Sequence, residues 1–89
     1  DREYIIEGSM NLDDLNDNLG LNLSSEDYDS LGGFIIEHLD RLPEQGDELT
    51  TDDGIRLVVE ALQKNRVESV HLYIPEGFYD RKEEDSFDF

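Results

Sequence analysis

The sequence of 89 residues contains no cysteine and no tryptophan. The absence of cysteine excludes disulfide bonds, thiolate chemistry and cysteine-based zinc sites. No apolar run approaches the roughly 18 residues of a membrane span. The N-terminal residues also lack the charged, then apolar, then small pattern of a signal peptide. We therefore expect no direct membrane insertion by this segment.

Basic residues are scarce as well, since 7 Lys and Arg stand against 24 Asp and Glu and give a formal net charge of −17. Residues 9–54 hold thirteen of the acidic residues and only one base, Arg41, whereas residues 55–79 hold three of each sign. A field of this kind repels phosphates and anionic lipids, and it attracts cations and basic protein surfaces. The charge therefore predicts no nucleic-acid partner.

The apolar residues make up only 36% of the sequence, but they are gathered into periodic segments that predict one small folded domain. The strongest pattern lies within residues 28–47, where one helical face carries Leu31, Phe34, Ile35, Leu39 and Leu42. We expect this central helix to begin after an N-cap at Asp29 or Ser30 and to end at Leu42, the residue before Pro43.

Two glycines, Gly32 and Gly33, lie inside the central helix, where each costs about 1 kcal/mol relative to alanine. A missing side chain permits close approach of two backbones. We therefore expect the helix backbone to contact a strand at these positions.

The first part of the chain predicts a strand at Tyr4–Glu7, ended by Gly8, followed by a short helix. Ser9 or Asn11 can cap this helix, which carries leucines at positions 12, 15 and 19 on one face and ends at Gly20. Because the chain starts on a strand with almost no lead-in, we expect it to be part of a longer protein.

The second half of the chain changes to an extended pattern. A weak strand at residues 48–51 precedes the hairpin turn Asp52-Asp53-Gly54, and the central strand covers residues 55–62. The last strand, residues 67–74, alternates, so Ser69, His71 and Tyr73 point away from the core.

The predicted fold is therefore α+β, a small antiparallel sheet covered on one face by two helices in the order β-α-α-β-β-β. Residues 1–77 form the domain. Residues 78–89 form an acidic, aromatic C-terminal tail.

This pattern, over about residues 3–75, resembles the CorC/HlyC transporter-associated domain. Its most specific piece is Leu31-Gly32-Gly33 followed at a fixed distance by Pro43-Glu44-Gln45-Gly46. Ser30 stands where the family commonly has threonine, which keeps a capping hydroxyl. The strand at residues 4–8, the leucines of the first helix and the segments 55–61 and 66–70 carry the rest of the resemblance.

The resemblance implies a non-catalytic accessory domain of hemolysin-like and magnesium/cobalt efflux proteins. Such a domain usually follows a pair of CBS domains at the C-terminus of a protein with a transmembrane region. It would lie on the cytoplasmic side and modulate transport of ions such as magnesium or cobalt. The fold is also grouped with FAD-binding domains of the PCMH type. This sequence has no glycine-rich phosphate loop and no base placed for a pyrophosphate, so we expect no flavin cofactor.

A small-ligand-binding domain is the alternative, for a divalent cation or, with less support, for FAD or an adenine nucleotide. Carboxylates that can hold a hard cation weakly cluster at Glu26, Asp27 and Asp29 and at Asp52 and Asp53. A solvated acidic face is the more common role of such clusters. The run from Asp14 to Asn18 opens like a calcium loop, but residues 19 and 25 lack the required glycine and glutamate.

The remaining candidates for chemistry are the two histidines and the serines. His38 is expected to pack its ring at the boundary of the central helix, and His71 to lie on the wet face of the last strand. No serine pairs with a base and an oxyanion hole at a recognisable spacing, so we expect no catalysis. The small core predicts that the exposed face of the last strand takes part in homodimerisation or docking.

Overall fold

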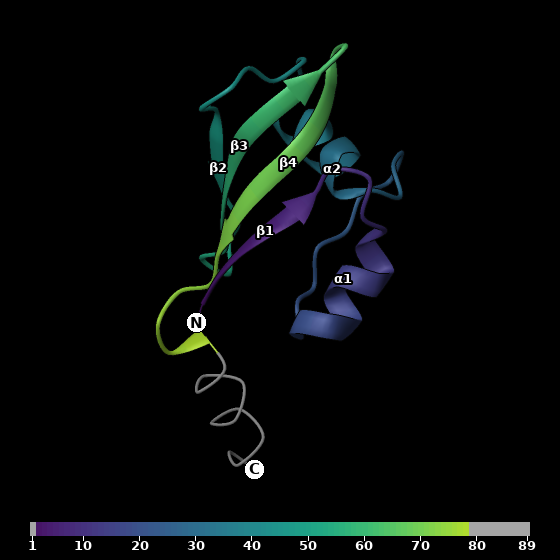
Figure 1. Ribbon diagram of the computed structural model, residues 1–89. Coiled ribbons are helices and arrows are strands. Elements are labelled where there is room, and N and C mark those ends of the chain that lie inside the picture. Colours follow the sequence, from purple (N-terminus) through teal and green to yellow (C-terminus); the bar gives the residue numbers. More distant parts are fainter. Residues whose placement is uncertain (1, 79–89) are drawn as a thin grey trace.

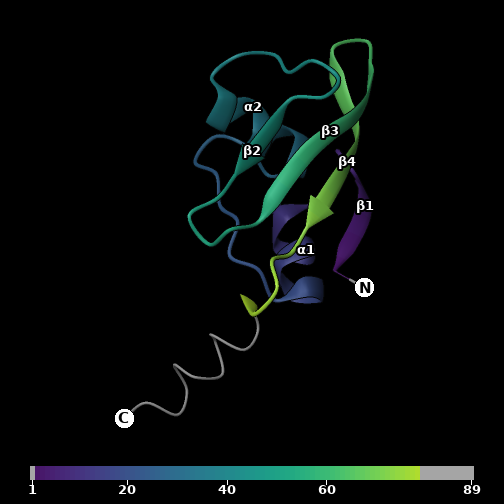
Figure 2. The ribbon, with the colours of Figure 1, turned by 90° about the vertical axis from the view of Figure 1, so that its left-hand side faces the viewer.

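The structure, a computed structural model, describes residues 2–78 as a four-stranded antiparallel sheet with two helices (Figure 1). The strands lie in the order β1-β4-β3-β2, and both helices lie on the same side of them (Figure 2). The predicted α+β class and the order β-α-α-β-β-β are confirmed. The elements are β1 (Glu3–Glu7), α1 (Leu12–Leu19), α2 (Leu31–Leu39), β2 (Glu48–Thr50), β3 (Arg56–Gln63) and β4 (Arg66–Tyr73).

Helix α1 has the caps that the sequence predicts. The Asn11 side chain accepts a hydrogen bond from the Asp14 amide at 3.1 Å, which satisfies one of the free amides of the first turn. Gly20 adopts the left-handed conformation, φ 68°, and its amide donates to the Asn16 carbonyl. Leu12 and Leu15 are buried against the core, so the apolar face is also confirmed.

Helix α2 begins as predicted, since the Ser30 hydroxyl accepts from the Gly33 amide at 3.2 Å. The predicted end at Leu42 is wrong. The helix ends at Leu39, because Asp40 turns into the left-handed region at φ 59° and its amide donates to the Ile36 carbonyl at 2.8 Å. Leu42 therefore leaves the apolar face and is 56% exposed.

The two glycines of α2 have different neighbours. The Gly32 amide donates to the Gly8 carbonyl at 2.8 Å, and a Cβ on Gly32 would lie 3.1 Å from that oxygen and 3.3 Å from the Val67 Cβ. The predicted close contact with the sheet is thus confirmed for Gly32. It is wrong for Gly33, where a Cβ would clash with the Tyr28 side chain.

Tight turns connect the three C-terminal strands. Gly54, at φ 91°, supplies the positive φ of the predicted turn between β2 and β3, and Lys64 and Asn65 both have positive φ between β3 and β4. The predicted alternation of the last strand is confirmed, since Val70 and Leu72 are buried. The core lies between the sheet and the helices and is formed by buried residues 12, 15, 21, 23, 31, 34, 35, 55, 57, 59, 67, 70, 72, 74 and 78.

The predicted tail begins with Phe78, which is 6% exposed and belongs to the core. Residues 79–89 of the tail lie outside the described part of the chain. Neither helix within residues 2–78 has the length and apolar character needed to cross a membrane.

Candidate functional site

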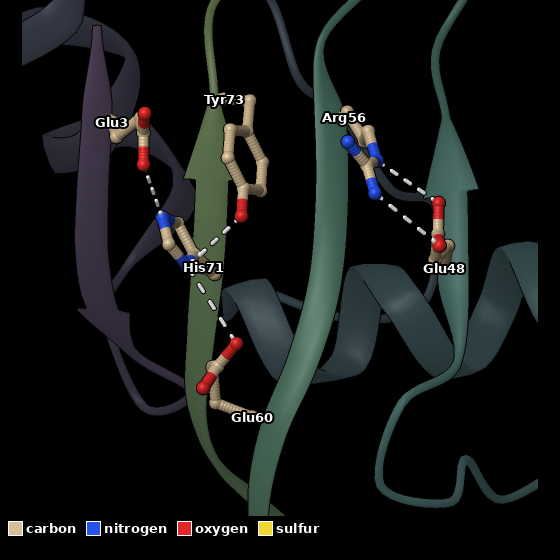
Figure 3. Close-up of polar contacts among 6 residues, drawn as sticks. All are labelled: Glu3, Glu48, Arg56, Glu60, His71 and Tyr73. Atoms are coloured by element: carbon tan, nitrogen blue, oxygen red, sulfur yellow. Dashed lines mark hydrogen bonds and ion pairs between the residues drawn. The ribbon is translucent and has the colours of Figure 1, made fainter.

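The face of the sheet opposite the helices carries a network of polar side chains (Figure 3). Alternation along each strand directs these side chains away from the core, and they come from all four strands. We call this surface the open face. Its network consists of Glu3, Glu48, Arg56, Glu60, His71 and Tyr73.

His71 is the centre of the network. Its Nε2 lies 3.0 Å from Glu3 Oε1, and its Nδ1 lies 3.2 Å from the Tyr73 hydroxyl and 3.6 Å from Glu60 Oε2. A carboxylate only accepts, so Nε2 carries the proton that is donated to Glu3, and in the neutral ring Nδ1 accepts from Tyr73. A second proton would place a positive charge between two carboxylates.

The network continues from Tyr73 to the other edge of the sheet. The rings of His71 and Tyr73 stack at 4.1 Å, and the Arg56 guanidinium lies 4.9 Å from the centre of the Tyr73 ring. Arg56 also donates two hydrogen bonds to Glu48, at 2.9 and 3.4 Å, which raises the pKa of Arg56 further above its usual value. The six residues of this network are therefore paired with one another.

The alternation of the last strand predicted that His71 and Tyr73 would lie on this face, and the structure confirms it. The partner Glu3 was not predicted. It lies 68 positions away in the sequence and reaches His71 only because β1 pairs with β4. Only the order of the strands in the sheet could reveal this neighbour.

The first predicted group of cation ligands, Glu26, Asp27 and Asp29, lies in the segment between α1 and α2, and all three side chains are exposed. The carboxylate that organises this segment is Glu37 on α2. It accepts from the Ser25 hydroxyl at 2.6 Å and from the Asp27 amide at 3.3 Å. The Ser25 hydrogen bond is the main reason why the pKa of Glu37 lies below its usual value.

The second predicted group, Asp52 and Asp53, lies in the turn between β2 and β3 and lines a pocket of about 320 Å³ together with His38. The ring of His38 packs on the Phe34 ring at 4.1 Å, as expected of a boundary residue. His38 Nδ1 lies 2.9 Å from the Phe34 carbonyl. Because a carbonyl only accepts, Nδ1 carries a proton and the lone pair of the neutral ring is on Nε2.

Within residues 2–78, no three side chains of Asp, Glu or His are arranged to share one metal ion. A cation at either acidic group would therefore keep most of its water ligands, which is usual for magnesium. Both groups stay a prediction of weak surface sites.

The segment after α2 contains an ion pair, Arg41 with Asp47, that was not predicted from the sequence. Arg41 donates to both carboxylate oxygens of Asp47, at 2.8 and 3.1 Å, and Asp47 also accepts from the Glu44 amide at 2.7 Å. The Arg41 guanidinium, and then the Glu44 amide, hold the pKa of Asp47 below its usual value. The Pro-x-x-Gly motif is therefore a closed turn. The sequence offered one indication of this pair, namely that Arg41 is the only Lys or Arg within residues 9–54.

Known families, relatives and solved structures include proteins that are similar to this chain. Residues 1–76 match the family described as Transporter associated domain, CorC_HlyC. The chain is 29% identical over 73 residues to the magnesium and cobalt efflux protein CorC of Salmonella typhimurium, covering 82% of this chain and 25% of that relative. The chain thus spans about a quarter of the length of this relative.

Solved structures have the same arrangement of elements. A functionally unknown conserved protein from Haemophilus influenzae superposes with a TM-score of 0.74 at 29% identity, covering 82% of this chain and 89% of that one. A transporter-associated domain from a Xylella fastidiosa hemolysin, solved in complex with Mg²⁺ and Mn²⁺, superposes with a TM-score of 0.72 at 22% identity. That comparison covers 83% of this chain and 89% of the other, and it shows the fold alone.

Proposed function

This chain belongs to the CorC_HlyC family of transporter-associated domains, and from that premise we propose that it is a non-catalytic accessory domain that modulates ion transport or efflux. The observation that carries the proposal is the match over residues 1–76. The ions are of the kind named in its relative from Salmonella typhimurium, magnesium and cobalt.

The proposal includes a larger protein around this domain. The curated relative is about four times as long as the matched segment, and the family resemblance implies a CBS-domain pair and a transmembrane region in the remainder. We place the domain on the cytoplasmic side of the membrane, at residues 1–77, with residues 78–89 as a tail. Homodimerisation through the exposed face of the last strand belongs to the same proposal.

Binding rather than chemistry suits the geometry of the domain. The six polar residues of the network on the open face are paired with one another, and the Ser30 hydroxyl caps a helix instead of facing a base. The acidic loops lie on exposed segments where an ion or a basic surface can approach. A change in bound ions would alter the charge of the domain and thereby its contacts with neighbouring domains.

A second candidate function, binding of a divalent cation, is supported by one specific observation. The domain from Xylella fastidiosa was solved with Mg²⁺ and Mn²⁺ bound. In this chain the oxygens of Asp52 and Asp53, or of Glu26, Asp27 and Asp29, would supply the ligands of a weak site. The grouping with PCMH-type FAD-binding domains is kept as a proposal about architecture only, because fold does not imply function.

The experiment that tests the proposed function uses the longer protein in cells that lack their own cobalt efflux. Cells with the intact protein are compared with cells in which a flexible linker of matched length replaces residues 3–77. We expect both proteins to confer cobalt tolerance, with the tolerated concentration shifted in the variant. Equal tolerance at equal expression would contradict a modulating role.

A further inference from the structure

Strand β1 forms one edge of the sheet, and its outer side has no neighbouring strand within residues 2–78 (Figure 3). The other edge strand, β2, has three residues, whereas β1 has five in regular register with β4. An exposed edge of this kind presents unpaired amides and carbonyls and can pair with another chain.

The hydrogen bonds at both ends of β1 fix which backbone groups face outward. The Gly8 amide donates to the Glu68 carbonyl, and the Arg2 carbonyl accepts from the Ile74 amide. The backbone amides and carbonyls of the even-numbered residues of β1 therefore point toward β4. The amide and carbonyl of Glu3 and of Ile5, and the amide of Glu7, therefore point away from the sheet. The Glu7 carbonyl already accepts from the Met10 amide.

The side chains along this edge are acidic at both ends and apolar at the centre. Ile5 is 63% exposed on the open face, between Glu3 and Glu7. The Glu3 side chain is 62% exposed although one of its oxygens contacts His71, and Glu7 accepts only a long bond of 3.5 Å from the Ser9 hydroxyl. Glu60 adds a further carboxylate nearby, while Arg56 is paired with Glu48.

The same glutamates oppose pairing of β1 with a second copy of itself. An antiparallel pair centred on Ile5 would place Glu3 of each copy opposite Glu7 of the other, and like charges directly opposite are destabilising. A strand with basic residues opposite Glu3 and Glu7 would instead form two pairs of opposite charge. On the helix side, Tyr4 and Ile6 are only partly buried and offer apolar contacts to the added strand.

We propose that the outer edge of β1 binds an extended, basic protein segment by strand addition. The segment has basic residues opposite Glu3 and Glu7, an apolar residue opposite Ile5, and apolar residues at the two positions between. Backbone hydrogen bonds to β1 supply affinity, and the alternation supplies specificity. The interaction goes beyond the proposed role in ion transport and does not depend on it.

The test titrates the ¹⁵N-labelled chain with a synthetic peptide whose centre is Lys-Val-Leu-Val-Lys. The matched controls are Glu-Val-Leu-Val-Glu, which inverts the charge, and Val-Lys-Leu-Lys-Val, which keeps the charge but moves the two lysines from the positions opposite Glu3 and Glu7 to those opposite Tyr4 and Ile6. We expect the first peptide alone to slow hydrogen exchange of the Glu3, Ile5 and Glu7 amides, since those amides gain partners. Equal binding of Val-Lys-Leu-Lys-Val, or changes centred on the acidic loops, would overturn the proposal and indicate general electrostatic attraction.

Two variants separate binding from folding. Ile5→Pro removes an outward amide, which is the position where an edge strand tolerates proline, and we expect it to abolish peptide binding. The charge reversal Glu3→Lys with Glu7→Lys should weaken binding of the basic peptide about tenfold and favour the acidic one. Unchanged binding by a folded charge-reversed variant contradicts the proposal. A dimer in sedimentation with protected β1 amides would identify a second copy as the occupant and overturn it as well.

Discussion

Asp47 shows how one carboxylate can hold a segment in a strongly acidic domain. It accepts two hydrogen bonds from Arg41 and one from the Glu44 amide, so it closes the turn that contains Pro43 and Gly46. Arg41 is the only base within residues 9–54. The turn therefore depends on the one Lys or Arg side chain in this part of the sequence.

The lowered pKa of Asp47 predicts a pH dependence of stability. A carboxyl group with a lower pKa in the folded state stabilises the fold above its unfolded pKa of about 3.9, and that stabilisation is lost as the pH falls through the folded pKa. We expect Asp47→Asn to be less stable than the native chain at neutral pH, with the difference shrinking below about pH 4. Urea unfolding across this range measures it.

The matched control is Asp53→Asn, because Asp53 accepts no side-chain or turn hydrogen bond among residues 2–78. Its removal should leave stability at neutral pH unchanged or raised, since it only reduces repulsion. A constant difference between native chain and Asp47→Asn at all pH values would contradict the role given to the ionised carboxylate.

The sign of the stability change caused by Gly32→Val tests whether this glycine has a steric role. Helix propensity alone makes Gly32→Val stabilising by a few tenths of a kcal/mol. The contact of the helix with Gly8 and Val67 instead predicts destabilisation by roughly 1 to 3 kcal/mol from overpacking. Denaturant unfolding distinguishes the two, and a variant as stable as the native chain would show that the glycine has no steric role.

At the scale of elements, the connection between α1 and α2 depends on one side chain. Asn16 accepts from the Leu23 amide at 2.9 Å and donates to the Leu23 carbonyl at 2.8 Å, so an irregular segment is fixed as if it were a paired strand. This contact also directs Leu21 and Leu23 into the core, where both are buried.

We expect Asn16→Ala to destabilise the domain by about 1 to 2 kcal/mol, because both backbone groups of Leu23 lose their partner. Asn18→Ala is the matched control, since Asn18 is exposed on the same helix and should change little. The measurement is the free energy of unfolding of the two variants. Equal losses would place the effect in the helix itself and not in the connection.

The elements show what the sequence can and cannot predict. The caps at Asn11, Ser30 and Gly20 were predictable, because a cap depends on residues within one turn of the helix. The end of α2 was not, since Asp40 adopts a positive φ that glycine usually takes, and the proline signal lies three residues later. The neighbours of Gly33 and His71 depend on the path of a loop and on strand order, which periodicity does not report.

At the scale of the whole molecule, the net charge of −17 is the dominant property. Repulsion among the carboxylates of residues 9–54 lowers stability at low ionic strength, and any salt reduces it over a Debye length of about 10 Å at 0.1 M. A specific site differs from screening, because its effect follows the binding isotherm of the ion.

We predict that millimolar magnesium raises the melting temperature in a background of about 0.15 M monovalent salt, more than sodium at matched ionic strength. The variant Asp52→Asn with Asp53→Asn should lose this gain if the site is in the turn between β2 and β3. The variant Glu26→Gln with Asp27→Asn and Asp29→Asn tests the other group. Equal effects of magnesium and sodium would exclude a site and leave the acidic face to solvation or to a basic partner.

We propose that this domain modulates ion movement through a larger protein and does not itself form the path. The most direct measurement is efflux of magnesium and cobalt from liposomes that contain the longer protein, with and without residues 3–77, as a function of the internal ion concentration. We predict that efflux persists without the domain and that its dependence on the internal ion concentration changes. Loss of efflux at every concentration, or an unchanged dependence, would contradict it.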